Sequence, residues 1–270
     1  MPNPGINNRE PCFVLRFTLL GSGSGGNAVL VATDRAKVLI DCGLTFKQLN
    51  LRAQAVGESL DGLRAVFITH EHSDHIKGLG VLARKLGVPL FMTAGTQAGL
   101  PPELGGLAAI EVFDAGDCIR IDGMAIESFS ISHDAVDPVS YTIEHAGAKL
   151  GMASDLGHVS QLVRARLHGS HGLILESNHC PEMLLRGPYP PVLKQRIRGR
   201  QGHLSNAEMN SLLSDLLHDR LQIVLLAHVS KENNTPELAL GMAAKVLEQH
   251  GARLAVARQD APTPLFEIHA

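Results

Sequence analysis

The chain has 270 residues, 44% of them hydrophobic and 19% charged, a composition typical of a globular protein with a sizeable core. Its net charge of −3 gives no argument for a polycation, so any phosphate-binding surface has to be local. No apolar run of about 18 residues predicts a membrane span, and the polar start lacks the apolar segment of a signal peptide. Four cysteines without CxxC spacing indicate neither a zinc knuckle nor a disulfide scaffold, and a reducing cytoplasm is the expected location.

The first half is predicted to be rich in short strands, because apolar runs alternate with turn signals. Strands are expected at 13–20, 28–32, 38–40, 65–69 and 88–92, followed by antiparallel strands within 118–131 and 139–152. Apolar spacing favours helices over 46–56 and 76–86. Residues 1–11 are expected to form a flexible N-terminus.

The second half alternates between helices and strands. Helices are expected at 159–167, 206–217 and 236–249, and strands at 172–176, 223–227 and 253–257. Ser205 and Glu208 have the spacing of a helix-capping box. No linker divides the chain, so we expect one domain over 1–270, with two sheets and helices outside them.

The segment His70-x-His72-x-Asp74-His75 directly follows a predicted buried strand. A metal ion needs several lone-pair donors that converge on one point, and a turn with four donors supplies them. His70 and His72 can point the same way, while Asp74 and His75 can face a second point nearby. The spacing therefore favours two ions over one.

Further donors follow other apolar runs, and each is expected at an edge of the core. They are Asp41, His133, Asp155 and His228. A lone histidine is more often a surface or satisfied core residue, which is the interpretation for His145, His168, His218, His250 and His269. Donors without cysteine suit Zn²⁺ best, with Mn²⁺ and Fe as alternatives.

This pattern of HxHxDH, then His, Asp and His at later strand ends, resembles the metallo-β-lactamase-fold hydrolases from Phe13 to about Leu254. The resemblance implies a four-layer αβ/βα sandwich with two divalent metal ions in a cleft at one edge. It assigns His70, His72 and His133 to one ion, Asp74, His75 and His228 to the other, Asp155 as the bridging carboxylate, and Asp41 as a brace behind the ligands. Two such cations lower the pKa of a bound water, which Asp74 is expected to orient.

Two segments are candidates for binding substrate phosphate. The glycine-rich stretch 21–27, with Ser24 and Asn27, can expose backbone N–H groups to an anion, although a flexible turn explains it equally well. Residues 202–206 open a helix whose N-terminus can bind phosphate; capping by Ser205 or Asn206 is the alternative, but it leaves His203 unexplained. His203 is therefore a second catalytic candidate beside Asp74. The basic run Lys194, Arg196, Arg198 and Arg200 lies beside that helix. A solvated face is its ordinary explanation, and its position next to the candidate phosphate site makes a role in substrate binding an equal alternative.

Several segments together are similar to the YycJ (WalJ) subfamily of this fold. They are 22–27, 69–75, 132–135, 154–157, 189–190, 202–206 and 228–234. That subfamily is bacterial, cytoplasmic and linked to 5′-to-3′ exonuclease activity on double-stranded DNA, so the resemblance implies phosphodiester hydrolysis at DNA ends. It also adds Asn233 and Asn234 to the phosphate-binding candidates and His179 to the residues that support the ligands, while Cys180 stands where an Asp is expected.

Two other interpretations stay open at this stage. The same metals serve hydrolases of small molecules, such as a β-lactam, a lactone or a thioester. A non-catalytic protein with structural metals is the third possibility, against which the complete donor set argues. Only about seventy residues separate Asp155 from His228, which leaves no room for the inserted domain of the β-CASP nucleases.

Overall fold

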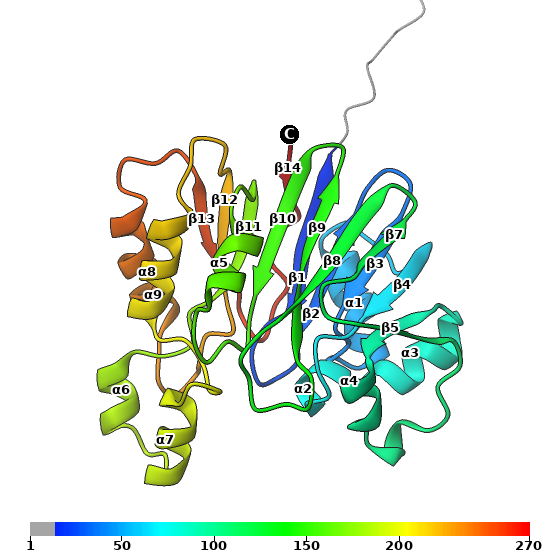
Figure 1. The fold of residues 1–270 in the computed structure, drawn as a ribbon, viewed down its shortest axis with the longest axis horizontal. Coiled ribbons are helices and arrows are strands. Elements are labelled where there is room, and N and C mark those ends of the chain that lie inside the picture. Colours follow the sequence, from blue (N-terminus) through cyan, green and yellow to red (C-terminus); the bar gives the residue numbers. More distant parts are fainter. Residues whose placement is uncertain (1–13) are drawn as a thin grey trace, which may run out of the picture.

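The computed structural model describes residues 14–270, so the expected flexible N-terminus lies outside the described residues. Two seven-stranded sheets form the centre of the molecule (Figure 1). The first has the order β14-β1-β2-β3-β4-β5-β6: β1 (Leu15–Gly21), β2 (Ala28–Ala32), β3 (Lys37–Ile40), β4 (Leu63–Phe67), β5 (Leu90–Thr93), β6 (Ile110–Phe113) and β14 (Phe266–Ile268). The second has the order β13-β12-β11-β10-β9-β8-β7: β7 (Cys118–Ile121), β8 (Met124–Ser130), β9 (Val139–His145), β10 (Ala148–Ala153), β11 (Gly172–Glu176), β12 (Ile223–Ala227) and β13 (Arg253–Val256).

Helices cover the outer faces of both sheets. Beside the first sheet are α1 (Phe46–Ala55), α2 (Ser73–Ile76), α3 (Leu79–Leu86), α4 (Ala94–Ala98) and the short 3₁₀ helix Pro102–Leu104. Associated with the second are α5 (Gln161–Leu167), α6 (Pro181–Arg186), α7 (Pro191–Arg198), α8 (Asn206–Leu216) and α9 (Pro236–Val246). In Figure 1, α6 and α7 project from the lower edge of the sandwich, the edge where α2 also lies.

Three buried apolar clusters hold these layers together. One lies between the sheets and includes Phe17 of β1 and Tyr141 of β9. Leu49 and Leu79 belong to a second, between the first sheet and its helices, and Leu213 to a third, under α5, α8 and α9. Central strands such as β2 are buried on both faces, as a sheet covered on both sides requires. The predicted four-layer αβ/βα sandwich is confirmed.

The predicted hairpins are confirmed, and one predicted helix is confirmed over most of its length but contains a break. Strands β7 and β8, and β9 and β10, pair antiparallel around turns at Asp122 and Ala146, which have positive φ. The helix expected over 76–86 is interrupted between α2 and α3, because the N–H of Gly78 donates to the carbonyl of Cys42 at 2.8 Å. The 42–44 segment passes too close there for a continuous helix.

The elements that were not predicted are α4, the 3₁₀ helix Pro102–Leu104, β6, α6, α7 and β14. Within residues 14–270, no helix combines the length and apolar character that crossing a membrane requires.

Candidate active site

The candidate site forms where strands of both sheets end. Strands β3 and β4 run parallel in one sheet, and β10, β11 and β12 run parallel in the other. Asp41, His70, Asp155 and His228 follow the carboxyl ends of four of these strands. Asp155 Oδ2 lies 3.3 Å from His75 Nε2, so the two sets of strand ends meet at one edge of the sandwich.

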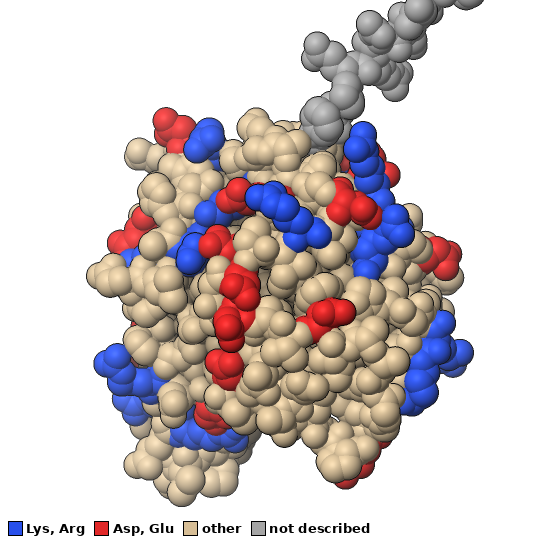
Figure 2. All heavy atoms as spheres, turned by 45° about the vertical axis from the view of Figure 1, so that its right-hand side comes forward, with Lys and Arg blue, Asp and Glu red and all other residues tan. Residues whose placement is uncertain are grey.

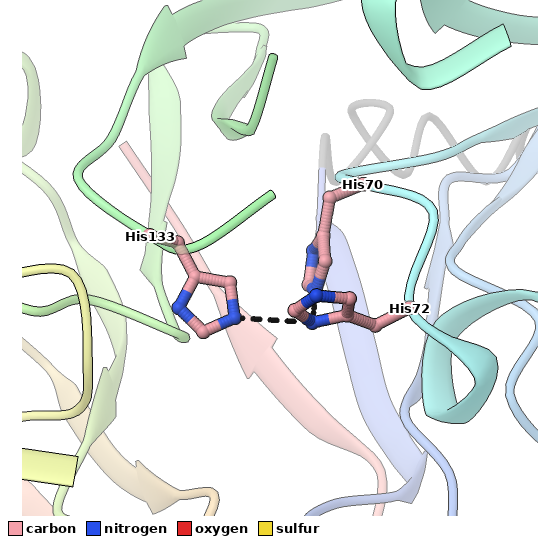
Figure 3. A group of neighbouring side chains, drawn as sticks. All are labelled: His70, His72 and His133. Atoms are coloured by element: carbon pink, nitrogen blue, oxygen red, sulfur yellow. Dashed lines mark hydrogen bonds between the residues drawn. The ribbon is translucent and has the colours of Figure 1, made fainter. Parts of the chain in front are cut away.

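Three histidines form the first cluster of donors. His70 and His72 come from the loop after β4 and His133 from the loop after β8, and their rings converge (Figure 3). His70 Nε2 lies 3.1 Å and His133 Nε2 3.3 Å from His72 Nδ1. The three rings can therefore direct one lone pair each toward a common point, as a metal ion requires.

Asp74, His75 and His228 form the second cluster. One donor atom from each lies within 4.8 Å of the others. His228 Nε2 is buried and has no hydrogen-bond partner among the described residues, although Asp155 and Asp74 oxygens lie 3.4 and 3.8 Å from it. A buried nitrogen that faces two carboxylates without bonding to them fits a cation between them.

Asp155 lies between the clusters. Its Oδ2 faces His75, and its Oδ1 lies 3.4 Å from His228 Nε2 and 3.9 Å from His133 Nε2. Burial by itself raises the pKa of this carboxyl, but the charges of His228 and His75 lower it well below its ordinary value. An ionised carboxylate in this place can serve both clusters at once.

Hydrogen bonds behind the rings fix which nitrogen faces the site. The Nδ1 of His75 lies 2.8 Å from Asp41 Oδ2, whereas that of His228 lies 3.1 Å from the side-chain nitrogen of Asn178 and 3.3 Å from Glu176 Oε1. His133 Nδ1 lies 3.3 Å from the carbonyl of Gly202. Asp41 and the Gly202 carbonyl each accept the Nδ1 proton of their histidine and leave Nε2 as the donor to a metal, the usual arrangement behind metal-bound histidines.

Backbone strain occurs at the same edge. Positive φ is found at six of the described non-glycine residues, and three of them lie here, namely Asp41, Asp155 and His228, with values of 61°, 55° and 52°. The left-handed region costs a non-glycine residue roughly 1–3 kcal/mol, and such strain is characteristic of functional sites. Here it turns each side chain off its strand end and into the site.

The loop of His72 to His75 packs against a segment that tolerates no side chain. A Cβ on Gly43 would lie 1.7 Å from the carbonyl oxygen of Asp74. Asn27 closes the same contact: its backbone N–H donates to the Asp74 carbonyl at 2.7 Å, and its side-chain amide donates to Asp74 Oδ2 at 3.1 Å. Asn27, predicted to bind phosphate, therefore contacts the loop of His72 to His75.

Glu176 has no role in the sequence-based predictions, yet it lies at the centre of the site. It is fully buried at the end of β11, and its Oε1 lies 2.7 Å from His203 Nδ1. Burial raises the pKa of this carboxyl, but the charges and hydrogen bonds of His203 and His228 lower it to about 2. Burial by itself lowers the pKa of His203, but the charge and the hydrogen bond of Glu176 raise this pKa above its ordinary value. A carboxylate at the end of an apolar strand was the sequence signal, the same one that marks Asp155.

Other predicted residues lie beside the site, in a buried network. The Asn206 amide donates to Asn234 Oδ1 at 3.0 Å, and Ser177 Oγ donates to Asn206 Oδ1 at 2.7 Å. Ser205 and Glu208 form the predicted capping box of α8. These side chains bond to protein groups and hold the start of α8 against the end of β11.

His179, Cys180 and Asn233 lie in the same region. The carbonyl of His179 accepts from the N–H of Asn206, and the N–H of Cys180 donates to the carbonyl of Asn233, at 2.9 and 2.8 Å. Burial lowers the pKa of His179. These residues join the α6 and α8 starts by main-chain contacts.

A pocket of about 260 Å³ opens onto the donors. Its lining includes His72, Asp74, His133, Asp155, His203 and His228, and also Ser24, Tyr189, Leu193, Arg196 and Ile197. Ser24 is the one predicted phosphate-binding residue that lines it. Figure 2 shows another face, on which basic and acidic side chains are interspersed among uncharged areas without a continuous basic surface.

Comparison with known proteins agrees with this fold. The Beta-lactamase superfamily domain matches residues 36–228. Exodeoxyribonuclease YycJ of Bacillus anthracis is 36% identical over 257 residues, covering 94% of each chain. Exodeoxyribonuclease WalJ of Streptococcus pneumoniae is 35% identical over 263 residues, covering 94% of this chain and 98% of its own. In fold, the metallo-β-lactamase fold protein YhfI of Bacillus subtilis superposes with a TM-score of 0.71 at 17% identity, covering 94% of this chain and 99% of its own.

A two-sheet sandwich with histidine and aspartate donors at one edge defines a metal-dependent hydrolase. The chain belongs to the metallo-β-lactamase-fold hydrolases and, among them, to the family of the YycJ and WalJ exodeoxyribonucleases. The predicted family is thereby confirmed.

Proposed function

We propose that this protein is a two-metal phosphodiester hydrolase that degrades double-stranded DNA from its ends in the 5′-to-3′ direction. The observation that carries the proposal is that the seven candidate metal donors converge at one edge of the sandwich, beside His203 and its buried partner Glu176. The names of relatives 35–36% identical over 94% of the chain support DNA as the substrate. Because DNA is the proposed substrate, the cytoplasm is the proposed location. The proposed working unit is one domain over 1–270.

In this proposal the two clusters hold one divalent ion each. His70, His72 and His133 bind the first, and Asp74, His75 and His228 bind the second, with Asp155 shared. Zn²⁺ is the first candidate for this donor set, and Mn²⁺ or Fe are the others. When bound, such ions lower the pKa of a water molecule and offset the negative charge of the attacked phosphate.

The chain's own residues complete the reaction. Asp74 lies in the pocket with its carboxylate 3.6 Å from His75 Nε2, where it can orient the attacking water. His203 uses Nδ1 to bind Glu176, which leaves Nε2 to donate a proton to the leaving oxygen. Ser24, at the pocket wall, is proposed to contact the substrate phosphate.

The remaining phosphate-binding candidates act indirectly in this proposal. Asn27, Ser205, Asn206, Asn233 and Asn234 shape the walls of the pocket, because their side chains or backbones bond to the segments that carry its lining. Asp41 and His179 support ligand-bearing segments in the same way.

The test uses metal-loaded protein and duplex DNA labelled on the 3′ end of one strand. With Mn²⁺ or Zn²⁺ we expect progressive shortening of the labelled strand from its 5′ end. His70→Ala is expected to abolish shortening and lower the bound metal, whereas His269→Ala, which removes an exposed histidine at the C-terminus, leaves both unchanged. Intact DNA after incubation with protein of confirmed metal content, together with rapid hydrolysis of a β-lactam or an acyl thioester, would overturn the proposal.

A further inference from the structure

Helix α7 forms one wall of the active pocket although none of its side chains belongs to a hydrophobic core. No residue of α7 is buried. Leu193, Arg196 and Ile197 nevertheless line the pocket that holds the metal donors. Their spacing places Leu193 and Ile197 on one side of the helix, one turn apart. An exposed helix at the mouth of a site contributes to substrate contact more than to stability.

The end of α7 is firmly attached to the catalytic residues. The N–H of His203 donates to the carbonyl of Ile197 at 2.9 Å, and Ser132 Oγ donates to the carbonyl of Arg200 at 2.7 Å. A Cβ on Gly202 would lie 2.2 Å from the carbonyl oxygen of Ile197, so the turn after α7 packs as closely as a glycine allows. Side chains on this last turn are therefore held in register with His203.

Arg196 is further fixed by a carboxylate. Its Nε donates to Asp134 Oδ2, and Asp134 Oδ1 lies 3.5 Å from His133 Nε2. The Arg196 side chain is 60% exposed. Because Nε is the nitrogen that Asp134 uses, the two terminal NH₂ groups are left to bind an anion such as a phosphate.

A second hollow adjoins the active pocket across Arg196. It is lined by Ser132, Asp134, Arg196, Gly199, Arg200 and Gln201. Asp134 and Arg196 line both hollows, so the surface is continuous from the metal donors to Arg200. Arg200 is exposed and makes no ion pair with any residue that the structure describes.

We propose that this second hollow binds the backbone phosphate next to the scissile one, through Arg196 and Arg200. The inference rests on the proposed function and deepens it: the enzyme selects a polynucleotide over a small diester because the neighbouring phosphate has a site of its own. Asp134 is a positioning residue, which orients Arg196 toward that phosphate.

Stabilisation of the helix dipole is the other reason for basic residues at the end of a helix. That effect accounts for Arg198, which lies in the last turn of α7 but lines neither hollow. It does not account for the Asp134 contact or for Arg200, which lies beyond the helix. Lys194 has a structural role, since its Nζ donates to the carbonyls of Leu185 and Gly187 at 2.8 and 2.7 Å. Arg198 is thus a matched control on the same helix.

The experiment compares Arg196→Gln, Arg200→Gln and Arg198→Gln in the metal-loaded protein. Each is assayed on a DNA duplex and on bis(p-nitrophenyl) phosphate, a diester without a second phosphate. We expect Arg196→Gln and Arg200→Gln to raise KM for DNA about tenfold and to reduce the preference for DNA over the small diester by a similar factor. In each of these two variants, the slope of log K for DNA binding against log salt concentration should fall by the amount that about one phosphate contact contributes. Arg198→Gln should behave as the wild type.

Asp134→Asn tests the positioning role. It should raise KM for DNA without lowering kcat or metal content, and adding it to Arg196→Gln should cause little further loss, because both changes remove one contact. Equal effects of all three arginine changes, or unchanged KM in Arg196→Gln and Arg200→Gln, would overturn the inference while leaving the nuclease activity standing. A wild-type protein that cleaves neither DNA nor the small diester would instead contradict the proposed function.

Discussion

The edge that carries the metal donors and helix α7 face the same pocket, but they are built in opposite ways. His70, His75, His133, Asp155 and His228 are 0–5% exposed. Helix α7 buries no residue and is attached through main-chain contacts at its end and through the side chains of Lys194 and Arg196. Buried, hydrogen-bonded groups hold the geometry that bond cleavage requires, whereas side chains on an exposed helix can be substituted at little cost to stability. In the proposed function, chemistry and substrate selection thus belong to regions of different burial.

The sharpest way to break this contrast is to remove the shared carboxylate. Asp155→Asn should lower kcat/KM for DNA by about 10³-fold or more, because one side chain serves both clusters. Metal analysis should show reduced occupancy. The control is Asp219→Asn, an exposed aspartate with the same chemical change. Activity within tenfold of the wild type would contradict the bridging role.

The second prediction concerns Glu176 and His203, which lie on the buried side of the pocket. His203→Ala should lower kcat by about 10²- to 10⁴-fold while the metal content stays constant, because a proton donor is lost and no metal ligand is. Glu176→Gln should also lower kcat, and the double variant should be little worse than His203→Ala. Additive losses would show that the two residues act independently.

The last prediction concerns the free energy of unfolding. Leu79 is fully buried under the first sheet, and Leu79→Ala should lower the free energy of unfolding by about 2–5 kcal/mol. Val192 of α7 is 77% exposed, and Val192→Ala should change it by less than about 0.5 kcal/mol. Denaturant titration of metal-free protein measures both. A loss at Val192 comparable to that at Leu79 would mean that α7 is part of the core.

Much of the fold could be predicted because its strands are apolar runs between turns. The hairpins around Asp122 and Ala146 follow from local turn signals. Helix α7 was missed because it buries no apolar stripe and begins at Pro191, next to Pro190, in a segment whose most visible feature is its basic run. The interruption between α2 and α3 was missed because it depends on the distant 42–44 segment.

By itself the sequence determined the class of the protein and its candidate metal donors. HxHxDH places four donors within six residues, and Asp41, His133, Asp155 and His228 each follow an apolar run, so both signals are local. Only the tertiary structure decided which strand ends meet. It joined His203 to Glu176 across 27 positions and Arg196 to Asp134 across 62, because segments this far apart in the sequence become neighbours only once the chain has folded.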